Sequence, residues 1–166
     1  MEKGINLALT NSLVEFDSLL KTAITAVSLK KLLLADDLAE VDSWKFQVGN
    51  YVRVQDEDEE ENESTLFWIG FGWEEDGKYK PSIWLEFDAK TCPEKYWGKI
   101  NKLAGTSGKY YSEVDFEFAQ VYMNAWIHFF LKEEYLKRFY EENADLNAQK
   151  EILTGFIKEV LDKLYT

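Results

Sequence analysis

The chain has very few of the residues that build the common chemical sites of proteins. Cys92 is its only cysteine and His128 its only histidine, so the chain alone forms neither a disulfide nor a cluster of several thiolate or imidazole metal ligands. A phosphate-binding glycine loop, a nucleophile elbow and a zinc motif are also missing from the sequence. We therefore expect no cofactor, and these absences weaken an enzymatic interpretation without excluding it.

Basic residues and long apolar runs are scarce as well. The chain has 19 basic against 31 acidic residues, a net charge of −12 at pH 7, and such a field repels the phosphate backbone of nucleic acids. No stretch approaches the roughly 20 apolar residues of a membrane span, and segment 1–9 lacks the apolar core of a secretory signal. The sequence thus predicts a cytoplasmic protein that binds neither nucleic acid nor membrane, and a charged partner would be basic.

Hydrophobic residues are abundant enough for one packed domain. They make up 46% of the 166 residues, and 16% are aromatic, which suits a compact domain rather than a disordered chain. No internal repeat or linker divides residues 1–166. Helical and strand periodicities both occur, so we predict a single α+β domain: an antiparallel sheet of about five strands with a long N-terminal helix, one middle helix and two C-terminal helices.

Capping residues and apolar spacing predict the individual elements. Ser12 and Glu15 have the spacing of a capping box, and apolar residues at helical spacing extend the first helix to about Leu34. Alternation predicts strands over 44–54, 114–118 and 126–131. Within the first, Gly49-Asn50 is either a hairpin turn or a bulge, and the last could instead be an early start of the following helix. Further helices are expected over 93–104, with Tyr96, Trp97, Ile100 and Leu103 buried, over 133–142, and after the cap Asp145.

A hairpin that is apolar on both faces runs from Leu66 to Phe87. Asp76-Gly77 is a strong signal for a two-residue turn, and this turn would pair Trp73 with Lys80 and Ile69 with Trp84. In that register Phe71, Trp73 and Trp84 share one face, whereas Trp68 lies on the other face with Gly70 and Gly72. The glycines would let another element approach that second face closely.

Such a hairpin must either lie between two layers or present one face to a partner. Covering helices on both sides are the simpler interpretation. If one side is open, we expect Phe71, Trp73 and Trp84 to form a binding patch rimmed by Lys80 and Glu86, because apolar anchors with a polar rim are typical of protein interfaces.

The most acidic stretch of the chain directly precedes this hairpin. Residues 56–63 carry seven carboxylates, and the rest of the chain would have a charge of only about −5 without them. Adjacent carboxylates repel one another and are poor strand formers, so the run predicts a loop. We expect it to attract a basic partner through the residues Asp56, Glu57, Asp58, Glu59, Glu60 and Glu61.

Glu86, Asp88 and Lys90 are spaced two apart and share a face of the second hairpin strand. Two carboxylates and a lysine could hold a divalent cation and position a water, and Asp88-Ala89-Lys90 resembles one half of the PD-(D/E)XK nuclease motif. That family needs a further acidic residue nearby. Asp76 is too distant, since twelve strand residues span roughly 40 Å at about 3.3 Å each, which leaves Glu15 or Asp17 as sources. Charges at a solvated strand end remain the simpler interpretation.

His128 and Cys92 also have simple structural interpretations. His128 lies among aromatic residues and suits a partly buried, hydrogen-bonded position, and Cys92 suits packing at a helix start. We therefore favour a non-enzymatic interaction or adaptor domain that binds a protein through its aromatic hairpin, its acidic loop, or both. The alternative is a metal-dependent hydrolase or nuclease-like domain that uses Glu86, Asp88 and Lys90. The sequence does not decide between them.

Overall fold

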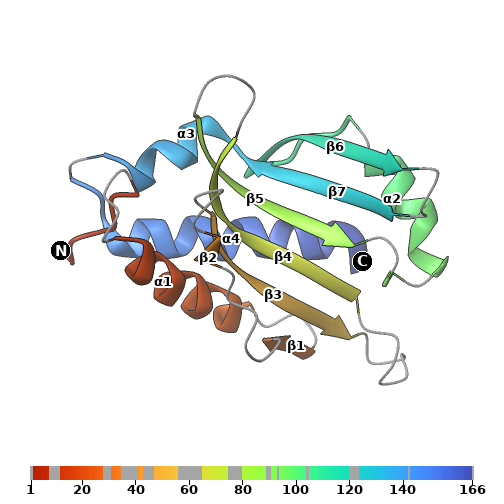
Figure 1. Cartoon of the computed structure of the whole chain (residues 1–166), viewed down its shortest axis with the longest axis horizontal. Helices are drawn as coiled ribbons and strands as arrows, with labels where there is room; N and C mark the ends of the chain where they lie inside the picture. Colours follow the sequence, from red (N-terminus) through yellow and green to blue (C-terminus); the bar gives the residue numbers. More distant parts are fainter. Residues whose placement is uncertain are drawn as a thin grey trace.

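The protein is an α+β domain in which helices pack on an antiparallel sheet (Figure 1). The structure is a computed structural model of the whole chain. It describes residues 2–7, 12–27, 31–34, 41–42, 47–55, 65–74, 80–88, 91–92, 94–103, 105–119, 124–141 and 143–165. The fold class expected from the sequence is confirmed, including the N-terminal, middle and two C-terminal helices.

The strands form one sheet in a nearly sequential order. In the part of the chain that the structure describes there are seven strands, in the order β1-β3-β4-β5-β7-β6, with β2 also paired to β3, and every pairing is antiparallel. Their bounds are β1 Lys31–Leu34, β2 Val41–Asp42, β3 Gln47–Gln55, β4 Thr65–Glu74, β5 Lys80–Asp88, β6 Tyr111–Ala119 and β7 Asn124–Leu131. The last strand predicted from the sequence is therefore confirmed as β7.

The helices are α1 Leu13–Ala26, α2 Trp97–Leu103, α3 Glu133–Leu136 and α4 Leu146–Tyr165, with 3₁₀ turns at Glu94–Tyr96 and Lys137–Phe139. Asp145 caps α4 as predicted, because its Oδ1 accepts a hydrogen bond from the backbone N–H of Asn147 at 2.8 Å. In the middle helix Tyr96, Ile100 and Leu103 are buried, but Trp97 is 45% exposed, so its predicted burial is wrong.

The first helix is shorter than its apolar spacing suggested. It ends at Ala26, and Val27 already has an extended backbone. Residues 31–34 form β1 instead, paired antiparallel with β3, so the predicted continuation to Leu34 is wrong. The capping box is not formed either, since Ser12 has a helical backbone and its side chain makes no capping hydrogen bond. Apolar residues satisfy either a helix or a strand, and here pairing with β3 determines the outcome.

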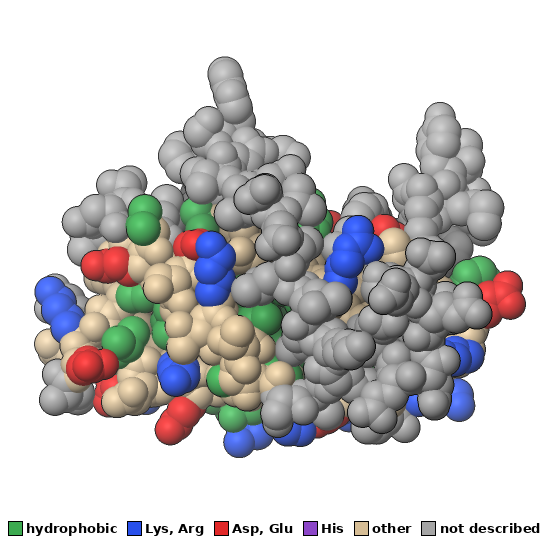
Figure 2. Space-filling view, turned by 90° about the horizontal axis from the view of Figure 1, so that it is seen from below, with side chains coloured by type: hydrophobic (Ala, Val, Ile, Leu, Met, Phe, Trp, Pro, Cys, Tyr) green, Lys and Arg blue, Asp and Glu red, His purple; other side chains and the backbone are tan. Residues whose placement is uncertain are grey.

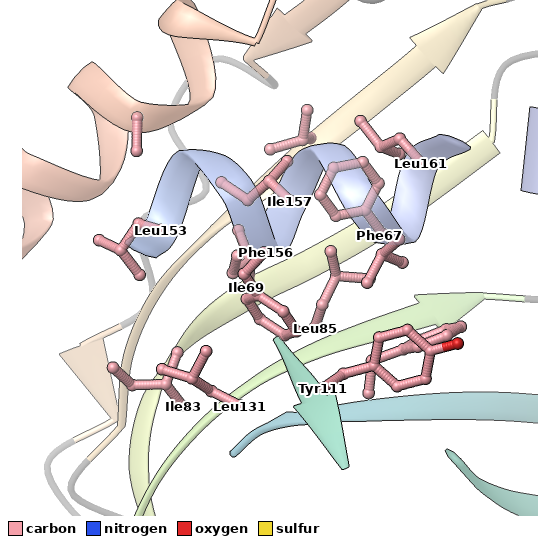
Figure 3. Close-up of a cluster of buried hydrophobic side chains, with 14 of the residues drawn as sticks. Phe67, Ile69, Ile83, Leu85, Tyr111, Leu131, Leu153, Phe156, Ile157 and Leu161 are labelled. Atoms are coloured by element: carbon pink, nitrogen blue, oxygen red, sulfur yellow. The ribbon is translucent and has the colours of Figure 1, made fainter. Parts of the chain in front are cut away.

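One face of the sheet packs against α4 and forms the core (Figure 3). Phe67 and Ile69 of β4 and Leu85 of β5 point toward Phe156 and Ile157 of α4, and each of these side chains is at most 1% exposed. α1 packs beside α4 and against β3, where the Asn50 side chain donates a hydrogen bond to Asp17 at 2.8 Å. Gly49 and Asn50 lie inside the continuous strand β3, so they form neither the hairpin turn nor the bulge that the sequence left open.

The β4–β5 hairpin has a register one residue away from the predicted one. Ile69 pairs with Leu85 rather than with Trp84, and Trp73 pairs with Pro81 rather than with Lys80. The last pair is Glu74 with Lys80, so residues 75–79 connect the strands instead of a two-residue turn. The reason is burial: this register puts the apolar sets of both strands on the helix side, Phe67, Ile69 and Phe71 with Ile83, Leu85 and Phe87.

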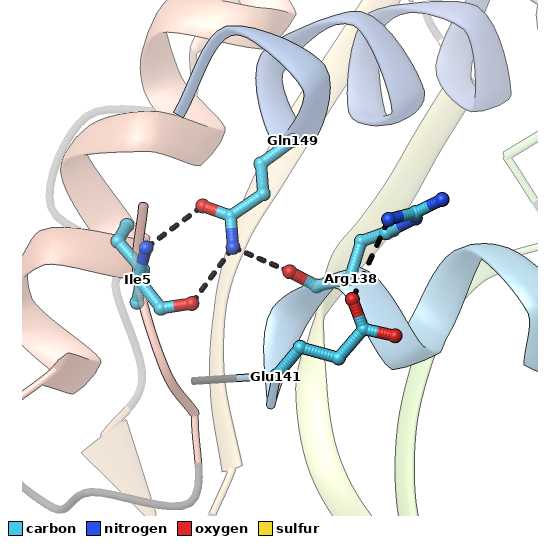
Figure 4. A network of polar contacts seen from close by, with 4 residues as sticks. All are labelled: Ile5, Arg138, Glu141 and Gln149. Atoms are coloured by element: carbon cyan, nitrogen blue, oxygen red, sulfur yellow. Dashed lines mark hydrogen bonds and ion pairs between the residues drawn. The ribbon is translucent and has the colours of Figure 1, made fainter. Parts of the chain in front are cut away.

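A fully buried side chain joins the N-terminal segment to the rest of the domain (Figure 4). Gln149 of α4 accepts a hydrogen bond from Ile5 N at 2.8 Å and donates to the carbonyl oxygens of Ile5 and Arg138, both at 2.7 Å. Backbone hydrogen bonds from Gly4 to Ala144 and from Leu7 to Phe139, both 2.7 Å, continue the attachment. The N-terminal segment is therefore attached to α4 by two buried hydrogen bonds between Ile5 and Gln149 and by partly buried ones around them.

Candidate functional site

The sheet face opposite α4 carries an aromatic cluster that the predicted register had divided. Trp68 of β4 and Trp84 of β5 lie on this same face with ring centroids 4.9 Å apart, and Phe130 of β7 lies 6.4 Å from Trp84. The prediction that the two tryptophans occupy opposite faces is wrong, because the one-residue change of register moves Trp84 across the sheet. Both indoles are buried, at 7% and 8% exposure.

Two glycines make room for the first indole. Gly49 of β3 pairs with Gly70 of β4, and a Cβ atom at either position would collide with the ring of Trp68. Gly70, one of the two glycines predicted to permit a close approach, thus accommodates a side chain of the same sheet. This explains how Trp68 becomes buried on the face opposite α4.

A glutamate–histidine pair lies beside the indoles. Glu86 Oε2 is 3.2 Å from His128 Nε2 and accepts a hydrogen bond from Trp84 Nε1 at 3.4 Å. The side chains of Glu86 and His128 are 29% and 20% exposed, so water still reaches the pair. His128 is therefore partly buried and paired, as expected from its aromatic neighbours in the sequence.

The register brings further acidic positions to the same face. Across β7, Asp115 of β6 lies opposite His128, which itself lies opposite Glu86. In the next row Glu117 and Asp88 lie opposite Trp126 from its two sides. Four acidic positions from two strands thus flank β7. This grouping was not predicted from the sequence. The alternation of acidic with apolar residues over 113–118 predicted that the acidic residues of this strand share one face, but not which strands would lie beside it.

The acidic run connects two strands at the same end of the sheet. β3 ends at Gln55 and β4 begins at Thr65, with Val54 paired to Thr65, so residues 56–64 leave and re-enter the sheet at adjacent points. β5 ends at Asp88 at this end, and β6 passes Glu117. We call this end of the sheet, where the strand ends Gln55 and Thr65 lie with Asp88 and Glu117, the acidic end. The run itself and its predicted loop lie outside the described residues.

The predicted aromatic binding patch is not assembled as one surface. Phe71 is on the helix side and 1% exposed, whereas Trp84 is on the opposite face and 8% exposed. Trp73 and Lys80 lie at the last two rungs of the hairpin, paired with Pro81 and Glu74. Phe71 and Trp84 are thus both buried, but on opposite sides of the sheet.

The structure agrees with one part of the metal-site hypothesis and contradicts another. Glu86 and Asp88 do share a face, while Lys90 lies outside the described residues. Asp17 of α1 bonds Asn50 on the helix side and Lys21 at 2.9 Å, so α1 is on the wrong side of the sheet to complete the site. Among the described residues there is no group of three or more histidine, cysteine or carboxylate side chains that could hold a metal ion.

Two described residues with a shifted pKa, Tyr140 and Lys109, lie away from this face. Burial raises the pKa of Tyr140, and its hydrogen bond to Glu133, 3.0 Å from hydroxyl to Oε1, acts in the same direction. The neighbouring Tyr110 raises the pKa of Lys109, whose amine lies 4.8 Å from the centre of that ring. Neither group contacts the glutamate–histidine pair, so these shifts give no sign of acid–base catalysis there.

A groove of about 680 Å³ lies at the opposite side of the domain, between the N-terminal segment, α1 and the start of α4. Its walls include both charges, with Glu15 and Lys150 among them. Figure 2, a view from below, likewise shows acidic and basic side chains interspersed over the coloured part of the surface. This mixture selects no ligand charge, unlike the acidic end.

Comparison with family models, with curated proteins and with solved structures finds no match to this chain. No helix in the described part of the chain has the length and apolar character needed to cross a membrane.

Proposed function

We propose that the chain is a non-enzymatic protein-interaction domain that binds a basic protein partner at its acidic end. The observation that supports this proposal is the position of the strand ends that flank the acidic run: β3 ends and β4 begins at the end of the sheet where Asp88 and Glu117 also lie. These acidic positions are far apart in the sequence. Carboxylates gathered at one end of a domain concentrate the negative field, which steers an oppositely charged partner and rejects acidic ones.

The burial of the hairpin supports charge rather than apolar anchoring as the main attraction. Trp68 and Trp84 are each less than 10% exposed, so little of their area is left for a partner to cover. An interaction dominated by exposed carboxylates weakens as salt is added, because the Debye length falls to roughly 8 Å at physiological ionic strength. We therefore expect an affinity and an association rate that depend strongly on salt.

The experiment compares two variants of equal net charge. One neutralises the run at Asp56, Glu57, Asp58, Glu59, Glu60 and Glu61 with the corresponding amides. The matched control neutralises six exposed glutamates elsewhere, Glu2, Glu15, Glu94, Glu134, Glu141 and Glu151. Binding of a lysine-rich peptide is measured by fluorescence anisotropy at low and at physiological salt. Loss in the first variant alone supports the proposal, and equal loss in both attributes binding to net charge and overturns it.

A metal-dependent hydrolase built on Glu86, Asp88 and Lys90 is the second candidate. The observation in its favour is the register, which puts Asp115 roughly 10 Å from Glu86, two strand spacings away across His128. A bound ion stabilises the native state by linkage. The hypothesis requires Mg²⁺ or Mn²⁺ to raise the melting temperature of the parent but not of Asp88→Asn, and an unchanged melting temperature in the parent rejects it.

A further inference from the structure

We propose that the outer edge of β6 is where an extended, basic segment of the partner adds as a further strand. This inference rests on the proposed function and specifies how the partner binds. β6 is the last strand in the sheet order, so one of its sides has no neighbouring strand in the part of the chain that the structure describes (Figure 1). Such an edge presents unpaired backbone donors and acceptors in a row.

Hydrogen bonds at the start of β6 show which backbone groups face outward. Val114 N donates to Thr106 O at 3.2 Å, and Val114 O accepts from Gly105 N at 3.4 Å. The backbone groups of Val114 thus point away from β7. Because outward and inward groups alternate along a strand, those of Phe116 and Phe118 point the same way. Segment 105–108 satisfies the edge only as far as Val114, and among the described residues no backbone hydrogen bond reaches the outward groups of Phe116 and Phe118.

A change of register limits the accessible edge to its second half. The β6–β7 pairing shifts between Tyr111 and Val114, and Gly108 N donates to Tyr111 O at 3.0 Å. The first half is therefore irregular and already covered by the preceding loop. From Val114 to Ala119 the pairing with β7 is regular, as strand addition requires.

The charge pattern identifies the occupant as basic. Asp115 and Glu117 alternate along β6 with Phe116 and Phe118, so an added strand with lysine or arginine at every second residue would have its basic positions next to the two acidic positions, on one face of the sheet. Apolar residues between them would fall on the side of Phe116 and Phe118. Main-chain hydrogen bonds would provide affinity and the alternating side chains specificity.

The same charges exclude a second copy of this chain. Pairing β6 with β6 of another molecule would bring Asp115 and Glu117 close to their own counterparts, and like charges directly opposite in a sheet are destabilising. Acidic edge residues are a common protection against self-association. Here Asp115 and Glu117 also favour a basic strand over an acidic one at this edge.

The test uses three synthetic peptides with the intact protein. The first alternates lysine and valine, the second replaces each lysine with glutamate, and the third is the lysine–valine peptide with every backbone nitrogen methylated. The third keeps all charges and side chains but donates no main-chain hydrogen bond. Binding is measured by fluorescence anisotropy, and amide hydrogen exchange of Phe116 and Phe118 is followed by NMR.

We expect the first peptide to bind and to slow exchange of both amides by roughly tenfold at a concentration about ten times its Kd, since only free protein then exchanges. The methylated peptide should bind much more weakly, and the acidic peptide should not protect the amides. Equal binding by both basic peptides without slowed exchange would leave the basic-partner proposal standing and overturn strand addition. Protection by the acidic peptide would also overturn it. Absence of binding by any basic peptide would reject both proposals.

Discussion

The indole rings of Trp68 and Trp84 lie on the same face of the sheet, with their centroids 4.9 Å apart at a tilt of 45°. Each is supported on a different side: Trp68 covers the paired glycines of β3 and β4, and Trp84 contacts Phe130 of β7. The pair therefore links β3 to β7 across the hairpin. Its contribution is one of packing, because both rings are buried.

Trp68→Ala and Trp84→Ala should each reduce the free energy of unfolding by about 3 to 5 kcal/mol, as expected for a buried aromatic residue. Because the rings contact one another, the double variant should lose roughly 0.5 to 1.5 kcal/mol less than the sum of the single variants. Urea titration measures all three values. Trp97→Ala, at a 45% exposed position, is the control and should cost clearly less. Strict additivity would contradict the contact.

Gly70→Ala should destabilise the sheet by about 1 to 3 kcal/mol through overpacking. A methyl group there would collide with the Val48 carbonyl oxygen and with the Trp68 ring, which has no free space to move into. Gly98→Ala is the matched control, because a Cβ at that position of α2 meets no atom within 4 Å. That substitution should stabilise the protein by roughly 0.4 to 1 kcal/mol. Thermal melting of the two variants should therefore shift in opposite directions.

Gln149→Met keeps the approximate size of the side chain but removes its amide. The N–H and C=O of Ile5 would then lose their partner in a buried place, and the C=O of Arg138 would lose it in a partly buried one. Each buried orphaned group costs roughly 1 to 3 kcal/mol, so the two groups of Ile5 alone predict a loss of at least about 2 kcal/mol in urea titration. Lys150→Met, at the next and exposed position, should change little. Faster exchange of the Ile5 amide would locate the loss.

Stability at alkaline pH should depend on Tyr140. Its pKa is raised above the ordinary value of 10.0 in the folded protein, so the protonated form is favoured by folding. The corresponding stability is complete below that ordinary value and is lost as pH rises through the raised pKa. The difference in unfolding free energy between the parent and Tyr140→Phe should shrink over this range. A difference that stays constant with pH would contradict the shift.

Much of the fold was predictable because alternation and capping are local signals. The spacing over 126–131 predicted β7, and Asp145 predicted the start of α4. The hairpin register was not predictable in this way. The Asp76-Gly77 signal favoured a two-residue turn, but burial of the apolar residues of both strands on the helix side requires the register in which residues 75–79 connect the strands. A global packing preference prevailed over a local one.

The acidic end was only half predictable for a similar reason. The run over 56–63 is visible in the sequence, but that Asp88 and Glu117 lie at the same end of the sheet as the strand ends flanking the run depends on β7 lying between β5 and β6. Periodicity predicts single strands but not their order in the sheet. Here β7, which follows β6 in the sequence, lies between β5 and β6. For the same reason the sequence did not predict that β6 is the last strand of the sheet.

The Gln149 attachment also orders events while the protein is being made. Ile5 and Gln149 are 144 positions apart, and at ribosomal rates of about 5 to 20 residues per second this interval lasts roughly 7 to 30 seconds. Throughout it the N–H and C=O of Ile5 must be satisfied by solvent or by other factors. The consecutive hairpin β3–β4–β5 has no such delay. In the nascent chain, joining of the amino-terminal segment to α4 is thus a late step, and substitutions at Gln149 should impair completion of the domain more than its initiation.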